Sequence, residues 1–336
     1  MRPRTLLLAA LLTLVPGCGE RPLGGSGRLV GRHLLLAGTP HEMGVWQGRL
    51  LGPRIRAFHA RWQAQACGGG ERGAALQEAC RVYADQALRR LPERLRQELD
   101  GLAAGSGLPA EDLLLTEGLG DGLRFHAIPP RLRGHLAAAQ GPRALLVPSG
   151  PDAALLADEL LLVERRPAEG EPTLVVAWPG SLGGLAGASA GGLAFLAAAV
   201  PAPVTNQSLA GSPFSLYARR ALERATSAED LVERLGGATA WRLLALDGPR
   251  DRRLLGLAQV AAVVTADLSA VPVFSLPPED EAGDVPIPAR APAPATFDAL
   301  LRDASPAAWW VRWQDDAWHV GLGADAVILE PLAPGR

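Results

Sequence analysis

Residues 38–58, GTPHEMGVWQGRLLGPRIRAF, predict the start and the first turns of a long amphipathic helix. Thr39 is placed to cap this helix, Pro40 takes the first helical position, and Glu42 follows three residues after the cap. That spacing is typical of a capping box, in which two side chains bond the free backbone N–H groups of the first turn. Apolar side chains recur at helical spacing along one side of the stretch: Met43, Trp46, Leu50, Leu51, Ile55 and Phe58.

The rest of the chain divides into a block of helices, a block of strands, two more helices and a second block of strands. Further early helices are expected over 71–90, from 92 to 105 and from 109 onward. The expected strands are 29–37, 143–147, 155–164, 173–178, 193–200, 241–246 and 254–264, and the later helices are 213–224 and 227–236. A β-hairpin is expected over 309–323, after a proline-rich excursion at 272–296. Blocks of this kind predict a layered α+β fold rather than a regular βαβ repeat.

Four segments of the chain match, in order and spacing, the markers of a known family. Residues 38–58 are similar to a glycine-rich first marker, and residues 91–114 (LPERLRQELDGLAAGSGLPAEDLL) to a second. Residues 178–195 (WPGSLGGLAGASAGGLAF) resemble a W-P-G block, and residues 211–235 (GSPFSLYARRALERATSAEDLVERL) an R-x-x-L-E-x-A block. Together they resemble the penicillin acyltransferase-like family of N-terminal-nucleophile hydrolases.

The family resemblance implies a four-layer αββα sandwich. The core of this sandwich would span residues 131–332, and a helical N-terminal segment of the same fold would span residues 29–130. Members of the family cleave themselves before a cysteine and use it to hydrolyse or transfer acyl groups of amides and thioesters. The freed α-amine of the nucleophile then serves as its base, because its pKa is about 7.7.

The positions that carry this chemistry in the family are altered here. In the best register His135 stands at the nucleophile position, and no cysteine lies within 120–150. Asp152 alone survives from the family's G-R-N-x-D pattern, and Ser189 stands where the G-M-N block has its asparagine. Asn206, the one asparagine of the chain, falls at a loop asparagine of the family. An imidazole cannot perform the acyl shift of self-cleavage, so the resemblance implies a scaffold that has lost its nucleophile.

Two other nucleophiles remain open on the sequence alone. Ser149, in the turn VPSGPD, would suit a self-processing hydrolase in a shifted register. The segment GASAGG matches the G-x-S-x-G elbow of α/β-hydrolases at Ser189, and Asp247 and His319 follow in the chain order of a triad. The sequence thus supports three hypotheses: a non-catalytic relative, an active self-processing hydrolase, and an esterase that uses Ser189.

Residues 1–17 predict an export signal that is removed from the mature protein. Arg2 and Arg4 precede an apolar run of about ten residues, which is too short to span a bilayer and typical of a signal peptide. The run ends in VPGC, which resembles a bacterial lipobox, so Cys18 is expected to carry a lipid anchor. Residues 18–28 are expected to form a flexible tether. The expected location is therefore the bacterial cell envelope, with membrane contact through the anchor.

Export places the other two cysteines in an oxidising compartment. Cys67 and Cys80 are expected to form a disulfide, with two structural thiols as the alternative. With so few potential ligands, no metal site is expected. No cofactor is predicted.

The amino-acid composition excludes several classes of function. The chain has 336 residues, of which 48% are hydrophobic, so it can bury a large core. Its 33 basic and 35 acidic residues give a net charge of −2, so nucleic acid is not an expected partner. No lysine occurs in the sequence, which excludes a Schiff-base lysine and a Walker lysine. The sequence thus predicts a lipid-anchored relative of acyltransferase-like hydrolases, with a small-molecule or peptide amide or thioester as its partner.

Overall fold

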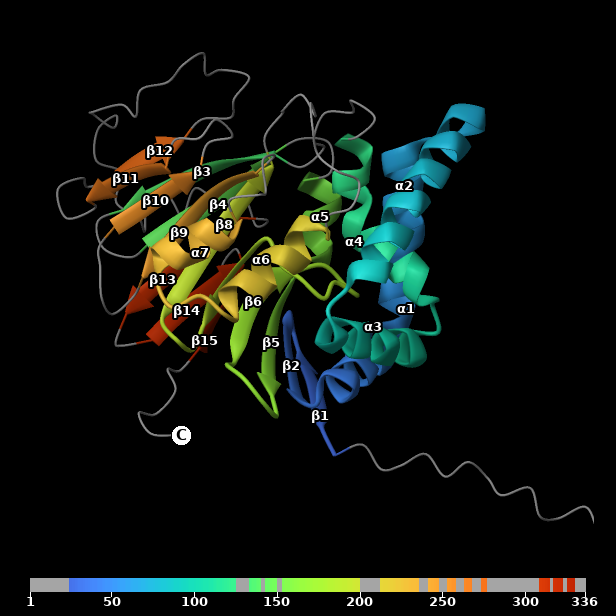
Figure 1. The fold of residues 1–336 in the computed structure, drawn as a ribbon, viewed down its shortest axis with the longest axis horizontal. Coiled ribbons are helices and arrows are strands. Elements are labelled where there is room, and N and C mark those ends of the chain that lie inside the picture. The colour runs from blue at the N-terminus through green and yellow to red at the C-terminus, as the bar shows by residue number, and fades with distance from the viewer. Residues whose placement is uncertain are drawn as a thin grey trace, which may run out of the picture.

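The protein has a mixed α+β fold (Figure 1), as its blocks of helices and strands predict. The computed structural model describes residues 24–124, 133–139, 143–149, 153–199, 212–235, 241–247, 253–257, 263–267, 273–276, 308–314, 317–322 and 325–329. The helices within these ranges are α1 (Pro40–Cys67), α2 (Gly70–Arg90), α3 (Glu93–Ser106), α4 (Ala110–Arg124), α5 (Ala153–Glu159), α6 (Phe214–Leu222) and α7 (Ala228–Leu235).

Two β-sheets carry the described strands. The nine-stranded sheet has, in spatial order, β1 (Ser26–Val30), β2 (His33–Gly38), β5 (Leu161–Pro167), β6 (Thr173–Ala177), β7 (Ala186–Ser189), β8 (Leu193–Ala199), β9 (Trp241–Asp247), β10 (Arg253–Leu257) and β11 (Val263–Asp267). The six-stranded sheet has β12 (Val273–Leu276), β3 (Arg133–Ala139), β4 (Arg143–Ser149), β13 (Trp309–Gln314), β14 (Ala317–Leu322) and β15 (Asp325–Leu329). Strands β2 and β5 pair in parallel, and the other described pairs are antiparallel. Because β1 and β2 belong to the nine-stranded sheet, the segment 29–130 contributes strands as well as helices.

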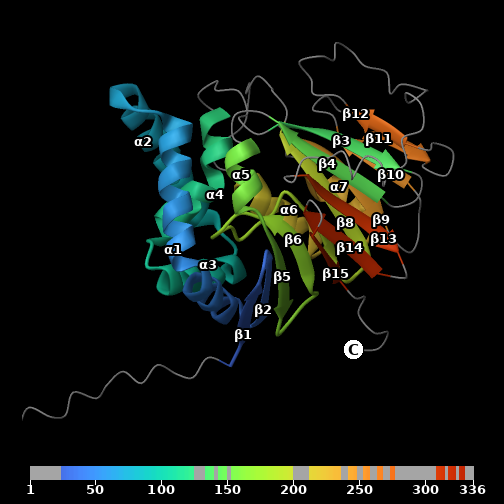
Figure 2. The ribbon, with the colours of Figure 1, turned by 180° about the vertical axis from the view of Figure 1, so that it is seen from behind.

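The two sheets lie face to face, and helices cover the other face of the nine-stranded sheet (Figures 1 and 2). Successive residues of a strand point to opposite faces. In β6, Leu174 and Val176 therefore lie in the same buried core as Trp309 and Trp318 of the six-stranded sheet, whereas Val175 belongs to the core under the helices. All of β6 is buried as a result. The described residues thus form one helix layer and two sheet layers.

Helices α1 and α3 touch backbone to backbone through glycines. A Cβ added at Gly44 would lie 2.0 Å from the carbonyl oxygen of Glu98, and one at Gly101 would lie 2.1 Å from that of His41. Gly48 and Gly105 meet in the same contact. Side chains at these positions would force the helices apart. The glycine spacing in the first two markers therefore encodes a close helix crossing.

Several sequence-based predictions are confirmed by the described elements. Thr39 and Glu42 form the expected capping box at the start of α1. Helices α6 and α7 lie where they are expected, and β13 and β14 form the expected hairpin.

Other predictions need correction. The expected strand 155–164 is helix α5 followed by β5, because its first half (LLADE) consists mostly of good helix formers and Glu159 is held by Arg54 at 2.8 Å. The expected strand 29–37 is the hairpin of β1 and β2, which turns at Gly31 with φ of +58°. The expected strand 254–264 is likewise two paired strands, β10 and β11.

The N-terminal end of the described chain is fixed rather than free. Strand β1 begins at Ser26, within the expected tether 18–28, and the residues just before it bond to α1. A search of the described helices finds none that is long and apolar enough to cross a membrane.

Candidate functional site

The segment 178–184, WPGSLGG, forms a buried loop between the nine-stranded sheet and the helices. It joins β6 to β7, yet each of its residues is buried. Glycines let it fit, since a Cβ at Gly183 would lie 2.3 Å from the carbonyl carbon of Ser215 in α6. Gly180 has φ of +82°, and a Cβ there would lie 2.9 Å from Ile55 of α1. A buried loop has no water for its backbone groups, so protein groups have to bond them.

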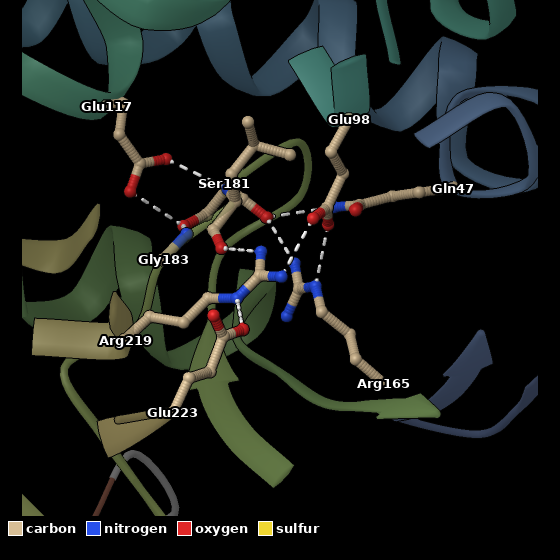
Figure 3. Close-up of polar contacts among 9 residues, drawn as sticks. Gln47, Glu98, Glu117, Arg165, Ser181, Gly183, Arg219 and Glu223 are labelled. Atoms are coloured by element: carbon tan, nitrogen blue, oxygen red, sulfur yellow. Dashed lines mark hydrogen bonds and ion pairs between the residues drawn. The ribbon is translucent and has the colours of Figure 1, made fainter. Parts of the chain in front are cut away.

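Side chains from three elements bond the carbonyl groups of the buried loop (Figure 3). The Ser181 carbonyl accepts a hydrogen bond from Gln47 Nε2 of α1 and another from Arg165 Nη2 of β5, both at 3.0 Å. The Leu182 carbonyl accepts one from Arg219 Nη1 of α6 at 2.6 Å. These contacts fix the loop to the sheet and to two helices at once.

An ion network orients the two arginines that bond the loop (Figure 3). Glu98 of α3 bridges them, with Oε1 at 2.8 Å from Arg165 Nε and Oε2 at 2.8 Å from Arg219 Nη2. Glu223 bonds Arg219 Nε at 2.8 Å. Burial alone would raise the pKa of Glu98, but Arg219 and Arg165 outweigh it and hold this pKa below its ordinary value. Glu98 is therefore an ionised carboxylate in the interior.

A second carboxyl group, that of Glu117 in α4, holds the other side of the loop. It accepts hydrogen bonds from Ser181 Oγ at 3.0 Å, from the Leu182 N–H at 3.2 Å, and from Ser215 Oγ. Burial raises the pKa of Glu117, and these three donors offset the rise only in part. Two buried carboxyl groups near the same loop thus differ in charge preference, because only Glu98 is bonded directly to arginines.

The ion network and Glu117 together form a cluster around the buried loop, and this cluster balances its charges within the interior. Glu98 and Glu223 offset Arg165 and Arg219, and the raised pKa of Glu117 favours its neutral form. Ser181 and Glu117 pair a hydroxyl with a carboxyl group, but both side chains are buried within the protein. A substrate cannot reach a nucleophile in that position without unfolding the loop. The arrangement is suited to holding the buried loop rather than to catalysis.

Ser189 does not lie on a nucleophile elbow, so that prediction is wrong. An elbow leads from a strand into a helix, whereas Ser189 ends β7 and a turn leads from it into antiparallel β8. Ser189 is 1% exposed, and its hydroxyl makes no hydrogen bond to any described residue. It lies beside Thr173 of β6, on the helix-facing side of the nine-stranded sheet.

His319 is not positioned to act on Ser189. It lies in β14 between Trp318 and Val320, whose side chains fill the layer between the sheets. His319 therefore points to the opposite, outer face of the six-stranded sheet. The side chain of Asp247, at the end of β9, lies outside the described residues. The proposed Ser189–His319 pairing is thus ruled out by the two sheets between them.

The other predicted catalytic residues are described only in part. His135 lies in β3, opposite Val147 of β4, and its side chain is outside the described part of the chain. Ser149 ends β4 opposite Arg133. Asp152, Asn206 and the predicted anchor Cys18 lie outside the described residues.

Cys67 and Cys80 are thiols in the structure, so the predicted disulfide is corrected to the alternative of two thiols. Cys67 ends α1 and Cys80 lies buried in α2. Burial, with a smaller effect of Cys67, raises the pKa of the Cys80 thiol to about 12. A thiol with so high a pKa is unreactive at neutral pH.

The described residues contain no group of three or more His, Cys, Asp and Glu side chains that could hold a metal ion. Comparison with known proteins adds no assignment: no protein-family model matches the chain, and the search of curated proteins finds no match.

Sequence reasoning did not single out the residues that form the cluster. Glu98 and Arg219 lie inside two of the stretches that resemble the acyltransferase-like family, and Ser181 lies in a third. In the sequence, Glu98 and Arg219 are charged positions between apolar helix positions. Such a pattern more often indicates a side chain on the solvent-exposed face of the helix. Burial of Glu98 and Arg219 depends on contacts between distant segments, so the local pattern does not show it.

Proposed function

We propose that this protein is a lipid-anchored envelope protein that keeps a penicillin acyltransferase-like scaffold but has lost the nucleophile. In this proposal it binds a small-molecule or peptide amide or thioester without cleaving it. We further propose that the whole chain completes the four-layer αββα sandwich, of which the described residues supply one helix layer and two sheets.

One observation supports this proposal above the others: the four stretches that carry the resemblance meet at one place in the interior. Gly44 of the first stretch touches Glu98 of the second, and Glu98 bonds Arg219 of the fourth. Arg219 in turn bonds the buried loop, which belongs to the third stretch. Residues that match a family because of shared packing are expected to contact one another in this way.

The positions expected to carry the family's chemistry support the loss of cleavage. His135 replaces the nucleophile, and an imidazole cannot take part in an acyl shift that needs a thiol or hydroxyl. Among the described hydroxyl groups near the cluster, Ser181 and Ser215 are engaged by Glu117 in the interior. Ser189 is buried, and its hydroxyl has no hydrogen-bond partner among the described residues. The retained residues thus support the scaffold and not the reaction.

A binding and turnover assay tests this function. The purified full-length protein would be mixed with a panel of N-acyl amino acids, penicillins and acyl thioesters. Binding would be followed by thermal shift, and product by mass spectrometry of the recovered compounds. We expect a shift of the melting temperature with at least one compound, which is then recovered unchanged. Release of a free acid or amine above the rate in buffer would contradict the proposal. The Ser189→Ala variant serves as the control and should behave like the natural protein.

A further inference from the structure

The first described residues, 24–27 (GGSG), form a docked segment on helix α1 and not a free linker. The Gly24 N–H donates to Glu42 Oε1 at 2.8 Å, and Trp46 Nε1 donates to the Gly25 carbonyl at 3.0 Å. Glycine is required for this contact. A Cβ at Gly25 would lie 2.4 Å from the carbonyl oxygen of Ala37, and one at Gly27 would lie 2.7 Å from Trp46 Cβ.

The same glutamate that starts α1 therefore holds the docked segment. Glu42 Oε2 accepts from the Thr39 N–H and from Thr39 Oγ1, each at 2.9 Å, while Oε1 bonds Gly24. Hydrogen bonds from Thr39 lower the pKa of Glu42, so the carboxylate is ionised at neutral pH. Because the capping box fixes Glu42, the docked segment is attached to the rigid start of a 28-residue helix.

We propose that the docked segment holds the body of the protein against the membrane by the end at which α1 begins. This inference rests on the proposed lipid anchor at Cys18, and its partner is the lipid surface that contains the anchor. Cys18 and Gly24 are six residues apart in the sequence, so the chain between them spans at most about 20 Å. A tether that stayed free to residue 28 would span up to about 35 Å. Docking thus shortens the distance by which the folded body can move away from the lipid anchor.

The fold determines which parts of the molecule then lie near the lipid. The Ala168 N–H donates to the Gly38 carbonyl at 2.8 Å, and a Cβ added at Gly38 would lie 2.8 Å from Gly25 Cα. The turn between β5 and β6 therefore lies beside the docked segment. Helix α1 leads away from this end toward the start of α2 (Figure 1). At 1.5 Å per residue, a helix of this length is about 40 Å long. Glu169 in the turn is therefore near the membrane, and Glu71 at the start of α2 is far from it.

Energy transfer to the membrane tests this orientation. The full-length lipidated protein would be placed in vesicles whose headgroups carry an acceptor dye. A donor would be attached to an azide-bearing residue introduced at Glu169 or at Glu71, both of which are exposed. We expect transfer to be about twofold or more higher from position 169, because most of the length of α1 lies between the two sites. A Gly/Ser insert of about 12 residues after Glu20 adds about 20 Å of reach and should remove most of this difference.

The results of this experiment distinguish a wrong orientation from a missing lipid anchor, on which the orientation rests. Membrane association with equal transfer from both positions would overturn the orientation and leave the lipid anchor intact. A difference that persists unchanged after the insert would also overturn it, since the docked segment would not be setting the distance. A protein that does not associate with vesicles at all would overturn both the anchor and the orientation. The insert lies before the first described residue, so it changes none of the described contacts of the docked segment.

Discussion

Glu98 of α3 and Arg219 of α6 form an ion pair at 2.8 Å in the interior, although 121 positions separate them in the chain. Both side chains are at most 1% exposed. The pair has a clear use in the fold, because Arg219 also bonds a carbonyl of the buried loop. Charged side chains here replace the water that an ordinary surface loop would use.

Removing the charge of Glu98 should destabilise the protein strongly. In Glu98→Gln, Arg165 and Arg219 remain buried with only Glu223 to offset them, and breaking a buried pair in this way costs about 3–5 kcal/mol. The matched control is Asp85→Asn, which removes the exposed i,i+4 pair with Arg89 and should change the free energy of unfolding by less than about 0.5 kcal/mol. Urea unfolding measures both. Equal effects of the two substitutions would show that the network does not hold the fold.

The two buried carboxyl groups predict opposite effects of pH. The pKa of Glu98 is lowered in the folded state. Glu98 therefore contributes to the free energy of unfolding above its ordinary pKa of 4.5, and this contribution is lost as the pH falls through the folded pKa. The pKa of Glu117 is raised in the folded state. Glu117 therefore contributes to the free energy of unfolding below pH 4.5, and this contribution declines as the pH rises through its folded pKa.

Glu117→Gln separates these two effects, because it removes only the titration of Glu117. The natural protein should lose stability relative to this variant as the pH rises above 4.5. Urea unfolding of both proteins at a series of pH values gives the difference. A difference that stays constant with pH would mean that Glu117 is not buried in the way described.

Replacing either of two helix glycines with alanine should change the free energy of unfolding, but in opposite directions. Gly44→Ala places a methyl group against the Glu98 carbonyl and should cost about 1–3 kcal/mol by pushing α1 from α3. A Cβ added at Gly120 of α4 would lie more than 4 Å from every other described element, so Gly120→Ala should stabilise the helix by about 0.5–1 kcal/mol. Thermal unfolding distinguishes them by sign. Stabilisation by both would contradict the close helix crossing.

Ser189 and Ser215 should also differ when they are changed to alanine. The Ser189 hydroxyl is buried with no partner in the described part of the chain, so Ser189→Ala should leave the stability unchanged or raise it. Ser215 donates to Glu117 in the interior, so Ser215→Ala should lower the free energy of unfolding by about 1–3 kcal/mol. Chemical denaturation of both variants measures this. A large loss of stability for Ser189→Ala would indicate a contact that the structure does not contain.

The sequence predicted those parts of the fold that depend on local pattern. The capping box at Thr39 and Glu42, the helices α6 and α7, and the hairpin of β13 and β14 each follow from residues close together in the chain. The prediction failed at α5, where residues that suit a helix lie next to a buried strand and the boundary depends on contacts with α1.

The candidate site was harder to predict, for a physical reason. The motif at Ser189 fits an elbow in its letters, but the partner strand β8 runs antiparallel to β7 and excludes that geometry. Glu98, Arg165 and Arg219 gain their role only when three distant segments meet at the buried loop. No local pattern marks such residues as buried.

The intact mass of the protein purified from membranes tests the central claim most directly, with and without a fluorophosphonate probe. We predict one polypeptide that begins at Cys18, carries the mass of a lipid modification and gains no adduct from the probe. Two polypeptides produced by cleavage near His135, or an adduct at Ser189, would contradict the claim that the scaffold persists without its reaction.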